Sequence, residues 1–224
     1  MKLAWKKSLA NKYSQLLATI ILLLVVAPIL EGKAESLFVA VVLFSTIIAI
    51  IRTLNLQKRF LFLLMILVGV AFSLDIYTSF RADLERDKLL LLIINAFYSL
   101  FIVIALITIN RAIFSVKKVN ADTIKGGISV FFLIGIFWAL LYMIVYYLDP
   151  NAFNQSVDTL SLFESMFYFS FTTLTTLGYG DITPVNSMAK ILTNLEAVTG
   201  MLYPSIFIAR LVGLYTAQEM MEGD

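Results

Sequence analysis

The sequence predicts an all-α membrane protein with six transmembrane helices and one shorter, re-entrant helix. Of its 224 residues, 60% are hydrophobic, and the mean hydropathy is +0.91, far too apolar for a soluble domain of this length. Six apolar runs are long enough to cross a bilayer. A seventh, residues 161–174, is too short to span and leads into a loop that contains two glycines. We therefore expect it to enter the membrane and return, surrounded by protein.

The six expected spans follow one another with polar connections between them. They fall at residues 14–30, 36–51, 60–78, 89–114, 128–148 and 188–214. Basic residues precede the first run, as in a secretory signal peptide, but its length of about 17 residues is adequate for a span and favours a retained helix. The connection at residues 115–127 either couples the first four helices to the last two or is a solvated connector, which Gly126 and Gly127 would loosen.

Basic residues predict the orientation of the chain. Twelve of the 17 lie on the cytoplasmic side if both termini are cytoplasmic, as the positive-inside rule favours. They are Lys2, Lys6, Lys7, Lys12, Arg52, Lys58, Arg59, Arg111, Lys117, Lys118, Lys125 and Arg210. The same orientation puts the loop after residue 174 near the outer face. We expect a multi-pass protein of the cell membrane that contacts membrane lipids.

The fourth expected span carries no repeated basic residues. Residues 89–110 contain no charged side chain, and Lys88 and Arg111 lie at the two ends of this run. Steep voltage sensing requires about 3–4 charges per subunit to cross the field. The first four helices are therefore expected to form a bundle that cannot sense voltage strongly.

Residues 175–181, Thr-Thr-Leu-Gly-Tyr-Gly-Asp, are the most informative stretch of the chain. Gly178 and Gly180 can adopt positive φ without steric cost, so the carbonyls of successive residues can turn to one side. Carbonyl oxygens of Thr176, Leu177, Gly178 and Tyr179 could then replace the hydration shell of a cation. The Thr176 hydroxyl would add another oxygen, and Asp181 would concentrate cations at the outer mouth. Tyr179 is expected to pack behind the loop.

Two stretches of the sequence carry a resemblance to a known family. Residues 168–184, YFSFTTLTTLGYGDITP, resemble the pore of tetrameric potassium channels, and residues 195–213 resemble the inner helix of prokaryotic members. The resemblance covers residues 124–216; before that it rests on the number of helices. It implies a prokaryotic six-helix, single-pore channel with a sensor-like domain that lacks gating charges.

The resemblance implies a potassium-selective channel that conducts K⁺ passively, with weak or no voltage gating, as a homotetramer. It divides the chain into a four-helix sensor-like domain at 1–123, a pore domain at 124–216 and a short cytoplasmic tail at 217–224. The alternative is a truncated or partner-gated potassium channel whose regulatory domain is absent from this chain. A transporter subunit, a non-conducting membrane partner and a poorly selective pore are weaker alternatives, because one complete Thr-x-Gly-Tyr-Gly loop is present.

The last expected span contributes the remaining candidate site residues. The family pattern implies that Met201, Ser205, Ile208 and Val212 line the pore, with the filter residues being Thr176, Leu177, Gly178, Tyr179 and Gly180. Gly200 and Pro204 weaken the helix in mid-membrane and mark either a hinge or a fixed kink. Glu196 is expected to brace the filter, as a satisfied buried carboxylate or as a protonatable group, with Tyr168, Thr172 or Thr173 as its partner.

Thr172 occupies the position at which many family members carry a carboxylate that pairs with the aspartate after the filter. How Asp181 is held is therefore left open. Arg210 is expected to face away from the pore, towards lipid headgroups or the linker. Histidine and cysteine are both absent, which argues against an enzyme. No cofactor and no nucleic-acid partner are expected; K⁺ is the permeant ion.

Overall fold

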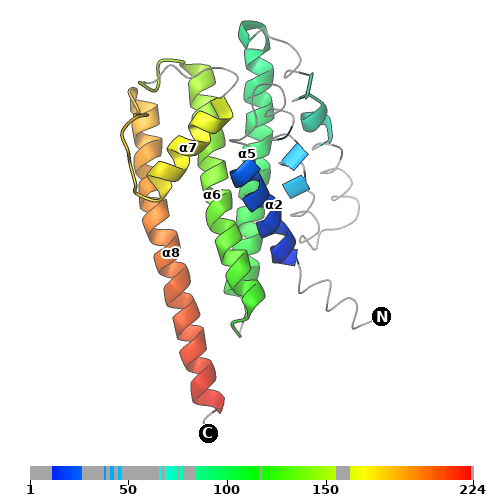
Figure 1. Cartoon of the computed structure of the whole chain (residues 1–224), viewed down its shortest axis with the longest axis vertical. Helices are drawn as coiled ribbons and strands as arrows, with labels where there is room; N and C mark the ends of the chain where they lie inside the picture. Colours follow the sequence, from blue (N-terminus) through cyan, green and yellow to red (C-terminus); the bar gives the residue numbers. More distant parts are fainter. Residues whose placement is uncertain are drawn as a thin grey trace.

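The computed structural model is helical and elongated, and its helices lie side by side (Figure 1). It describes residues 12–26, 84–116, 118–154 and 162–222, together with short helical pieces between residues 38 and 77. The second and third expected spans lie largely outside the described residues. Within the described part there are three helices long and apolar enough to cross a membrane, and a shorter apolar helix at Tyr13–Val26.

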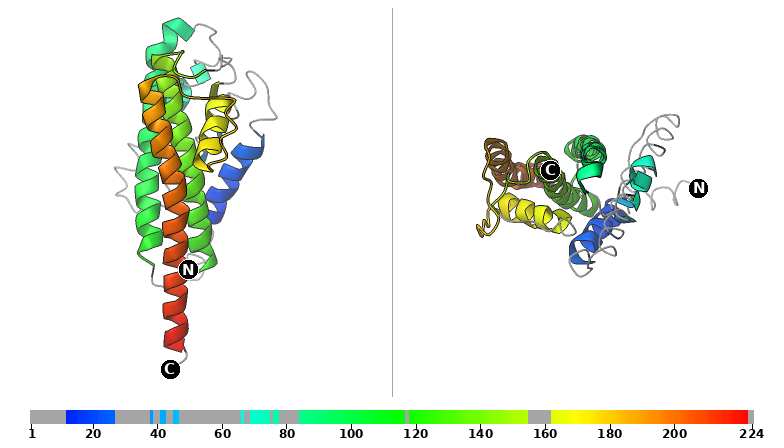
Figure 2. Two further views of the ribbon diagram at one scale, coloured as in Figure 1. Left: turned by 90° about the vertical axis from the view of Figure 1, so that its left-hand side faces the viewer. Right: turned by 90° about the horizontal axis from the view of Figure 1, so that it is seen from above.

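Helix α6, Ala121–Leu148, stands at the centre and contacts the four other labelled helices (Figure 1). On one side it packs against α2, Lys12–Val26, and α5, Leu84–Phe114. On the other side lie α7, Leu162–Leu174, and α8, Ser187–Glu222. The view from above shows α7 and α8 on the side of α6 away from α2 (Figure 2).

The start of α6 argues against one of the two alternatives for residues 115–127, a connector that Gly126 and Gly127 would loosen. Asn120 caps the helix by accepting a hydrogen bond from the Thr123 amide at 2.8 Å, so α6 begins at Ala121 and contains both Gly126 and Gly127. A Cβ on Gly126 would lie 2.9 Å from Ile113, and one on Gly127 would overlap the Phe207 ring. The two glycines therefore allow α5 and α8 to approach α6 closely, which a pattern of single residues cannot reveal.

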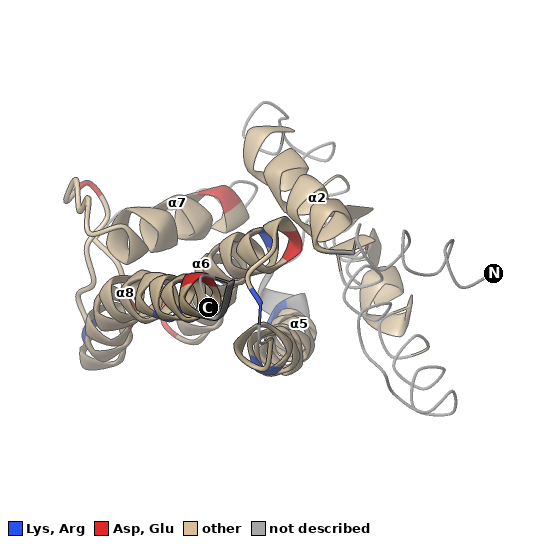
Figure 3. Cartoon of the chain, turned by 90° about the horizontal axis from the view of Figure 1, so that it is seen from below, with Lys and Arg blue, Asp and Glu red and all other residues tan. Residues whose placement is uncertain are grey.

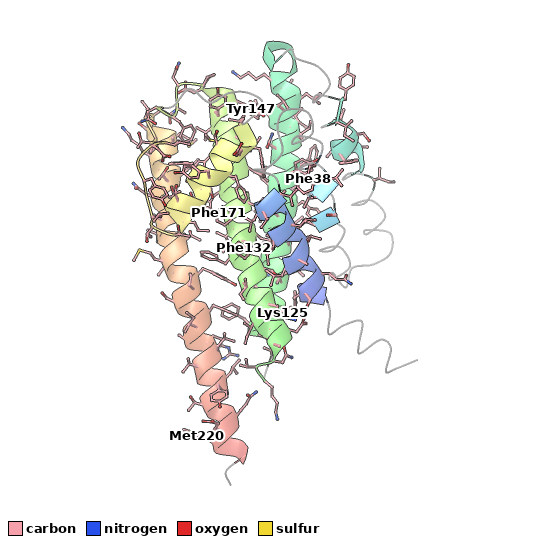
Figure 4. The ribbon with its side chains drawn as sticks, viewed as in Figure 1. Phe38, Lys125, Phe132, Tyr147, Phe171 and Met220 are labelled. Atoms are coloured by element: carbon pink, nitrogen blue, oxygen red, sulfur yellow. The ribbon has the colours of Figure 1, made fainter. Side chains whose placement is uncertain are left out.

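Helix α7 is short and slants across α6 and α8 near one end of the molecule (Figure 1). Its bounds agree with the expected re-entrant run at 161–174. Aromatic side chains attach it to α6: the ring centroids of Phe171 and Phe132 are 6.1 Å apart (Figure 4), and those of Phe169 and Tyr142 are 4.9 Å apart. These contacts fix the position of the loop that follows α7.

Helix α8 continues well beyond the ends of its neighbours (Figure 2). It runs without interruption through Pro204 to Glu222, so residues 217–222, expected as a tail, continue the helix. Seen from below, the described ribbon has few charged residues along its length (Figure 3). This distribution agrees with the apolar spans that the sequence predicts.

Candidate functional site

The signature loop, residues 175–181, leaves the C-terminal end of α7 with an alternating backbone. Thr176, Gly178 and Gly180 have φ angles of 59°, 55° and 80°, so every second residue lies in the left-handed region. The two glycines adopt the conformation expected of them. Thr176 was not expected to do so, because a β-branched residue at positive φ is strained. Such strain concentrates at functional sites.

The backbone amides of the signature loop point back to the end of α7. The amides of Leu177 and Gly178 donate to the carbonyl oxygen of Thr172 at 2.9 and 3.0 Å, and the Thr176 amide donates to Thr173 at 2.9 Å. The Thr172 hydroxyl, by contrast, donates to the Phe169 carbonyl of its own helix at 3.0 Å. Thr172 thus holds the loop through its main chain, whereas the sequence had drawn attention to its side chain.

Asp181 is held by Tyr168, a partner that the sequence did not reveal. The Tyr168 hydroxyl donates to Asp181 Oδ2 at 2.7 Å, and the Ile182 amide donates to Oδ1 at 3.1 Å. The bond from Tyr168 lowers the pKa of the Asp181 carboxyl, because it stabilises the charged form. Tyr168 also stacks on Tyr179, with parallel rings 6.4 Å apart. One tyrosine of α7 thereby supports both ends of the Tyr179–Asp181 turn.

The segment after the signature loop is fastened to the loop that follows α6. The Asn154 amide donates to the Thr183 carbonyl at 3.0 Å, and the Thr183 amide donates back to Asn154 Oδ1 at 2.7 Å. The Val185 amide donates to the Ala152 carbonyl at 2.8 Å. The loop after α6 therefore holds the segment that follows the signature loop.

Glu196 is fully buried where α6, α7 and α8 meet. Its Oε2 accepts a hydrogen bond from the Tyr142 hydroxyl, and its Oε1 lies 2.5 Å from the Ser170 hydroxyl. The partners expected from the sequence, Tyr168, Thr172 and Thr173, are not those that the structure gives. Helical periodicity identified the side of α8 on which Glu196 lies, but the nearest hydroxyls depend on how α6 packs behind α7.

Gly200 marks the closest approach of α8 to α7. A Cβ at this position would overlap the carbonyl oxygen of Leu174 and lie 2.8 Å from its carbonyl carbon. Because the obstacle is backbone, it cannot move aside as a side chain can. The sequence suggested Gly200 and Pro204 as a hinge; α8 is a continuous helix at both, and the structure gives Gly200 a packing role that the hinge hypothesis did not include.

The four residues expected to line a pore lie on exposed surface of α8. Met201, Ile208 and Val212 are 63%, 58% and 59% exposed, and the Ser205 hydroxyl donates to the Met201 carbonyl at 2.7 Å. Other apolar side chains of α8 are exposed with them: Leu195, Val198, Leu202, Ile206 and Tyr215. The apolar surface of this helix is thus wider than a single stripe.

Two hydrogen bonds connect the lower half of α8 to the neighbouring helices. The Tyr203 hydroxyl donates to the Gly127 carbonyl at 3.0 Å, and Arg210 donates to the Phe114 carbonyl at 3.3 Å. Phe114 is the last residue of α5, so a cation there complements the negative end of the helix dipole. Of the two alternatives for Arg210, the structure shows contact with the linker end of α5.

Residues 129–217 match the family model described as "Ion channel". These residues comprise most of α6, all of α7, the signature loop and most of α8. The match supports an ion channel family. Such a domain, together with the apolar helices, also indicates a membrane protein and suggests that the chain is not an enzyme.

Three relatives match parts of the chain. Protein LctB of Bacillus caldotenax is 34% identical over 80 residues, and Protein LctB of Geobacillus stearothermophilus is 31% identical over 80 residues. Each alignment covers 34% of this chain and 59% of the relative. Two-pore potassium channel 4 of Arabidopsis thaliana is 44% identical over 52 residues, which cover 23% of this chain and 18% of that protein. No solved structure matches the chain.

Proposed function

We propose that this chain forms a potassium-selective channel that conducts K⁺ passively across the cell membrane. The observation that carries the proposal is the backbone of the signature loop. Residues with positive φ, namely Thr176, Gly178 and Gly180, alternate with residues that lack it. The amides of residues 176–178 donate hydrogen bonds to carbonyls at the end of α7. Alternating handedness directs successive amides to one side and the carbonyls to the other. Coordination of a dehydrated K⁺ requires a row of carbonyl oxygens that face away from α7 and are available to the ion.

The residues of the loop fit a potassium ion. Within the described residues no group of three or more His, Cys, Asp or Glu is placed to hold a metal ion, and we propose oxygen atoms of the loop as the ligands. We assign these to Thr176, Leu177, Gly178 and Tyr179, with the Thr176 hydroxyl at the inner end. Asp181, held as a carboxylate by Tyr168, supplies negative charge at the outer mouth. Hard oxygen ligands of this kind suit K⁺.

One chain supplies a quarter of each coordination ring, and we therefore propose a homotetramer. The exposed apolar surface of α8 supports self-association. Only 11% of its most apolar stretch is buried in the single chain, against 67% of the most apolar stretch of α6. A tetramer would place part of this surface against other copies and part around the pore, including Met201, Ser205, Ile208 and Val212. Both termini are proposed to be cytoplasmic, on the distribution of basic residues.

Potassium as the ion gains support from one relative. The name of Two-pore potassium channel 4 states the ion for that protein, and its 44% identity over 52 residues is the highest of the three matches. The alternative of partner-controlled gating stays compatible with the contacts of α8 to the linker end of α5, since those contacts could transmit movement of the first helices.

The test is ion flow through the purified protein in a planar bilayer with opposed potassium and sodium gradients. We expect the reversal potential to follow the potassium gradient and to ignore sodium. A reversal near the sodium potential, or equal permeability of the two ions, would refute potassium selectivity. Native mass measurement in mild detergent should give four times 25.2 kDa. A monomer that conducts would contradict the tetramer.

A further inference from the structure

A chain of hydrogen-bonded polar groups is buried among the apolar side chains behind the signature loop. It consists of Tyr142 from α6, Glu196 from α8, Ser170 from α7 and the main-chain carbonyl of Gly135 from α6, and we refer to it as the Glu196 cluster. All three side chains are fully buried. The cluster joins the three helices that surround the signature loop.

The hydrogens available in the cluster determine the protonation state of Glu196. Ser170 Oγ lies 2.8 Å from the Gly135 carbonyl oxygen and 2.5 Å from Glu196 Oε1, but a hydroxyl has a single hydrogen to donate. The Gly135 carbonyl can only accept. If Ser170 donates to Gly135, then the hydrogen between Ser170 and Glu196 must belong to the carboxyl group. The Tyr142 hydroxyl donates to the other oxygen, Oε2.

An ionised Glu196 satisfies this geometry poorly. Ser170 would have to donate to the carboxylate, and its oxygen would then face the Gly135 carbonyl at 2.8 Å with no hydrogen between them. The full negative charge would also lie in an apolar layer with no Lys or Arg in the cluster to compensate it. A neutral carboxyl group leaves every donor and acceptor of the cluster paired.

We propose that Glu196 is a buried neutral acid that donates its proton to Ser170. Tyr142 and Ser170 are then positioning residues that keep this proton in place. The hydrogen bonds run in one direction, from Glu196 to Ser170 and from Ser170 to the Gly135 carbonyl. The Tyr142 hydroxyl donates to the other carboxyl oxygen of Glu196. The same proton ties α8 to α7 and, through Ser170, to α6.

The consequence for the signature loop rests on the proposed channel function. Ser170 lies two residues before Thr172, whose carbonyl holds the amides of Leu177 and Gly178. Loss of the proton would turn the Ser170 hydroxyl from Gly135 to Glu196 and release that attachment of α7 to α6. The orientation of the loop would then be less well defined.

Two other tyrosines of α7 and α8 bond elsewhere. Tyr168 of α7 bonds Asp181, and Tyr203 of α8 bonds the Gly127 carbonyl. Among the described residues, Tyr142 is the titratable side chain that bonds Glu196. The protonation of Glu196 is therefore set by its own cluster.

Infrared spectroscopy of the full chain, reconstituted in lipid, tests the proton directly. At pH 7 an ordinary glutamate, with a pKa of about 4.3, is ionised. We expect the parent protein at pH 7 to show the carbonyl stretch of a protonated carboxylic acid, and Glu196→Gln to lack it. Glu219→Gln, which removes an exposed carboxyl from the same helix, should retain the band. If the parent and Glu196→Gln spectra coincide in this region at pH 7, Glu196 is ionised and the proposal is wrong.

A variant series separates the proton from simple packing. The glutamine side chain can donate to Ser170 and accept from Tyr142, so Glu196→Gln should unfold within about 2 °C of the parent. Glu196→Ala and Ser170→Ala interrupt the chain and should lower the unfolding midpoint by about 5 °C or more. If the unfolding midpoint of Glu196→Gln is no higher than that of Glu196→Ala, the proposed role of the proton is wrong.

Ion flow distinguishes this proposal from the proposed function. If the channel function holds, Ser170→Ala and Glu196→Ala should lose potassium-over-sodium selectivity, and Glu196→Gln should recover more of it than Glu196→Ala. If the parent itself passes no selective potassium current but the infrared band and the glutamine rescue are present, the proton site stands and the channel function fails. If the parent passes selective potassium current but the infrared band is absent, the channel function stands and the proton site fails.

Discussion

The signature loop and the helix contacts behind it depend on two different kinds of constraint. The loop is exposed in the single chain, and a Cβ on Gly178 would meet nothing within 4 Å, so its special feature is backbone conformation. Gly200 of α8 has ordinary helical conformation, and its special feature is that it has no room for a side chain. In the signature loop the constraint acts on backbone conformation, whereas at Gly200 it acts on the space between α8 and α7.

Substitutions of these two glycines should therefore have different consequences. A substitution in the loop is expected to change ion flow with little change in the packing of the helices. A substitution at the helix crossing is expected to disturb packing first and ion flow as a consequence.

Gly200→Ala is expected to have the largest effect on the folded protein. The added methyl would overlap the Leu174 carbonyl, and backbone cannot give way without moving the end of α7. Overpacking typically costs about 1–3 kcal/mol, and we expect the upper end, about 3 kcal/mol. Thermal unfolding in detergent measures the loss, and selective current should fall with it.

Gly213→Ala is the matched control on the same helix. A Cβ at Gly213 would meet nothing within 4 Å, and alanine favours a helix by about 1 kcal/mol over glycine. The control should therefore be neutral or slightly stabilising in the single chain. Equal losses at the two positions would show that glycine flexibility, rather than close approach, is what α8 requires.

Gly178→Ala is expected to abolish selective potassium current while largely preserving the helical fold. The backbone has φ of 55°, a conformation that costs an L-residue about 1–2 kcal/mol. The loop should relax and lose the alignment of its carbonyls. Reversal potentials in mixed potassium and sodium measure the selectivity, and circular dichroism measures the helices. Intact selectivity in this variant would contradict the assigned role of the loop.

Tyr168→Phe is expected to have an intermediate effect that depends on pH. Loss of the phenol hydroxyl removes the hydrogen bond that lowers the pKa of Asp181, so that pKa should rise towards its ordinary value. More Asp181 would then be neutral at a given acidic pH outside. We expect the pH of half-maximal inhibition of the potassium current to move upward.

Tyr215→Phe serves as the control for that titration, since it removes a tyrosine hydroxyl from the far part of α8. It should leave the acid titration of the current where it is in the parent. If the pH of half-maximal inhibition moves downward in Tyr168→Phe, or moves equally in both variants, Asp181 is not the group that causes the acid inhibition.

Arg111→Gln is expected to have the smallest effect. Arg111 lies in the last turn of α5 and is exposed, and residues 89–110 of that helix carry no charge. Even a full transfer of this charge would yield about 2.3 kcal/mol per subunit per 100 mV. We expect the conductance–voltage relation to be unchanged and to depend instead on the permeant ion. A steep relation that flattens in this variant would show that the first helices sense voltage.

Local pattern in the sequence predicted much of residues 121–222. Hydropathy and length predicted a short helix at 161–174, and the structure has a helix at Leu162–Leu174. Its re-entry into the membrane stays a prediction. The glycines of the signature loop were expected at positive φ, and Gly178 and Gly180 adopt it. The start of α6 was predicted too late, at 128, because Asn120 acts as a cap and two glycines are tolerated in the helix. The domain division at 123 and the homotetramer stay predictions.

The sequence by itself determined the order of α6, α7, signature loop and α8, because hydropathy and glycine conformation are properties of neighbouring residues. Only the tertiary structure decided that Tyr168 holds Asp181, that Tyr142 and Ser170 enclose Glu196, and that Gly200 admits the Leu174 carbonyl. Most of these pairs join different helices, and the Tyr168–Asp181 pair joins a helix to the loop beyond it. Which side chains meet there depends on the distances and rotations at which helices pack, and these are set by the whole interface.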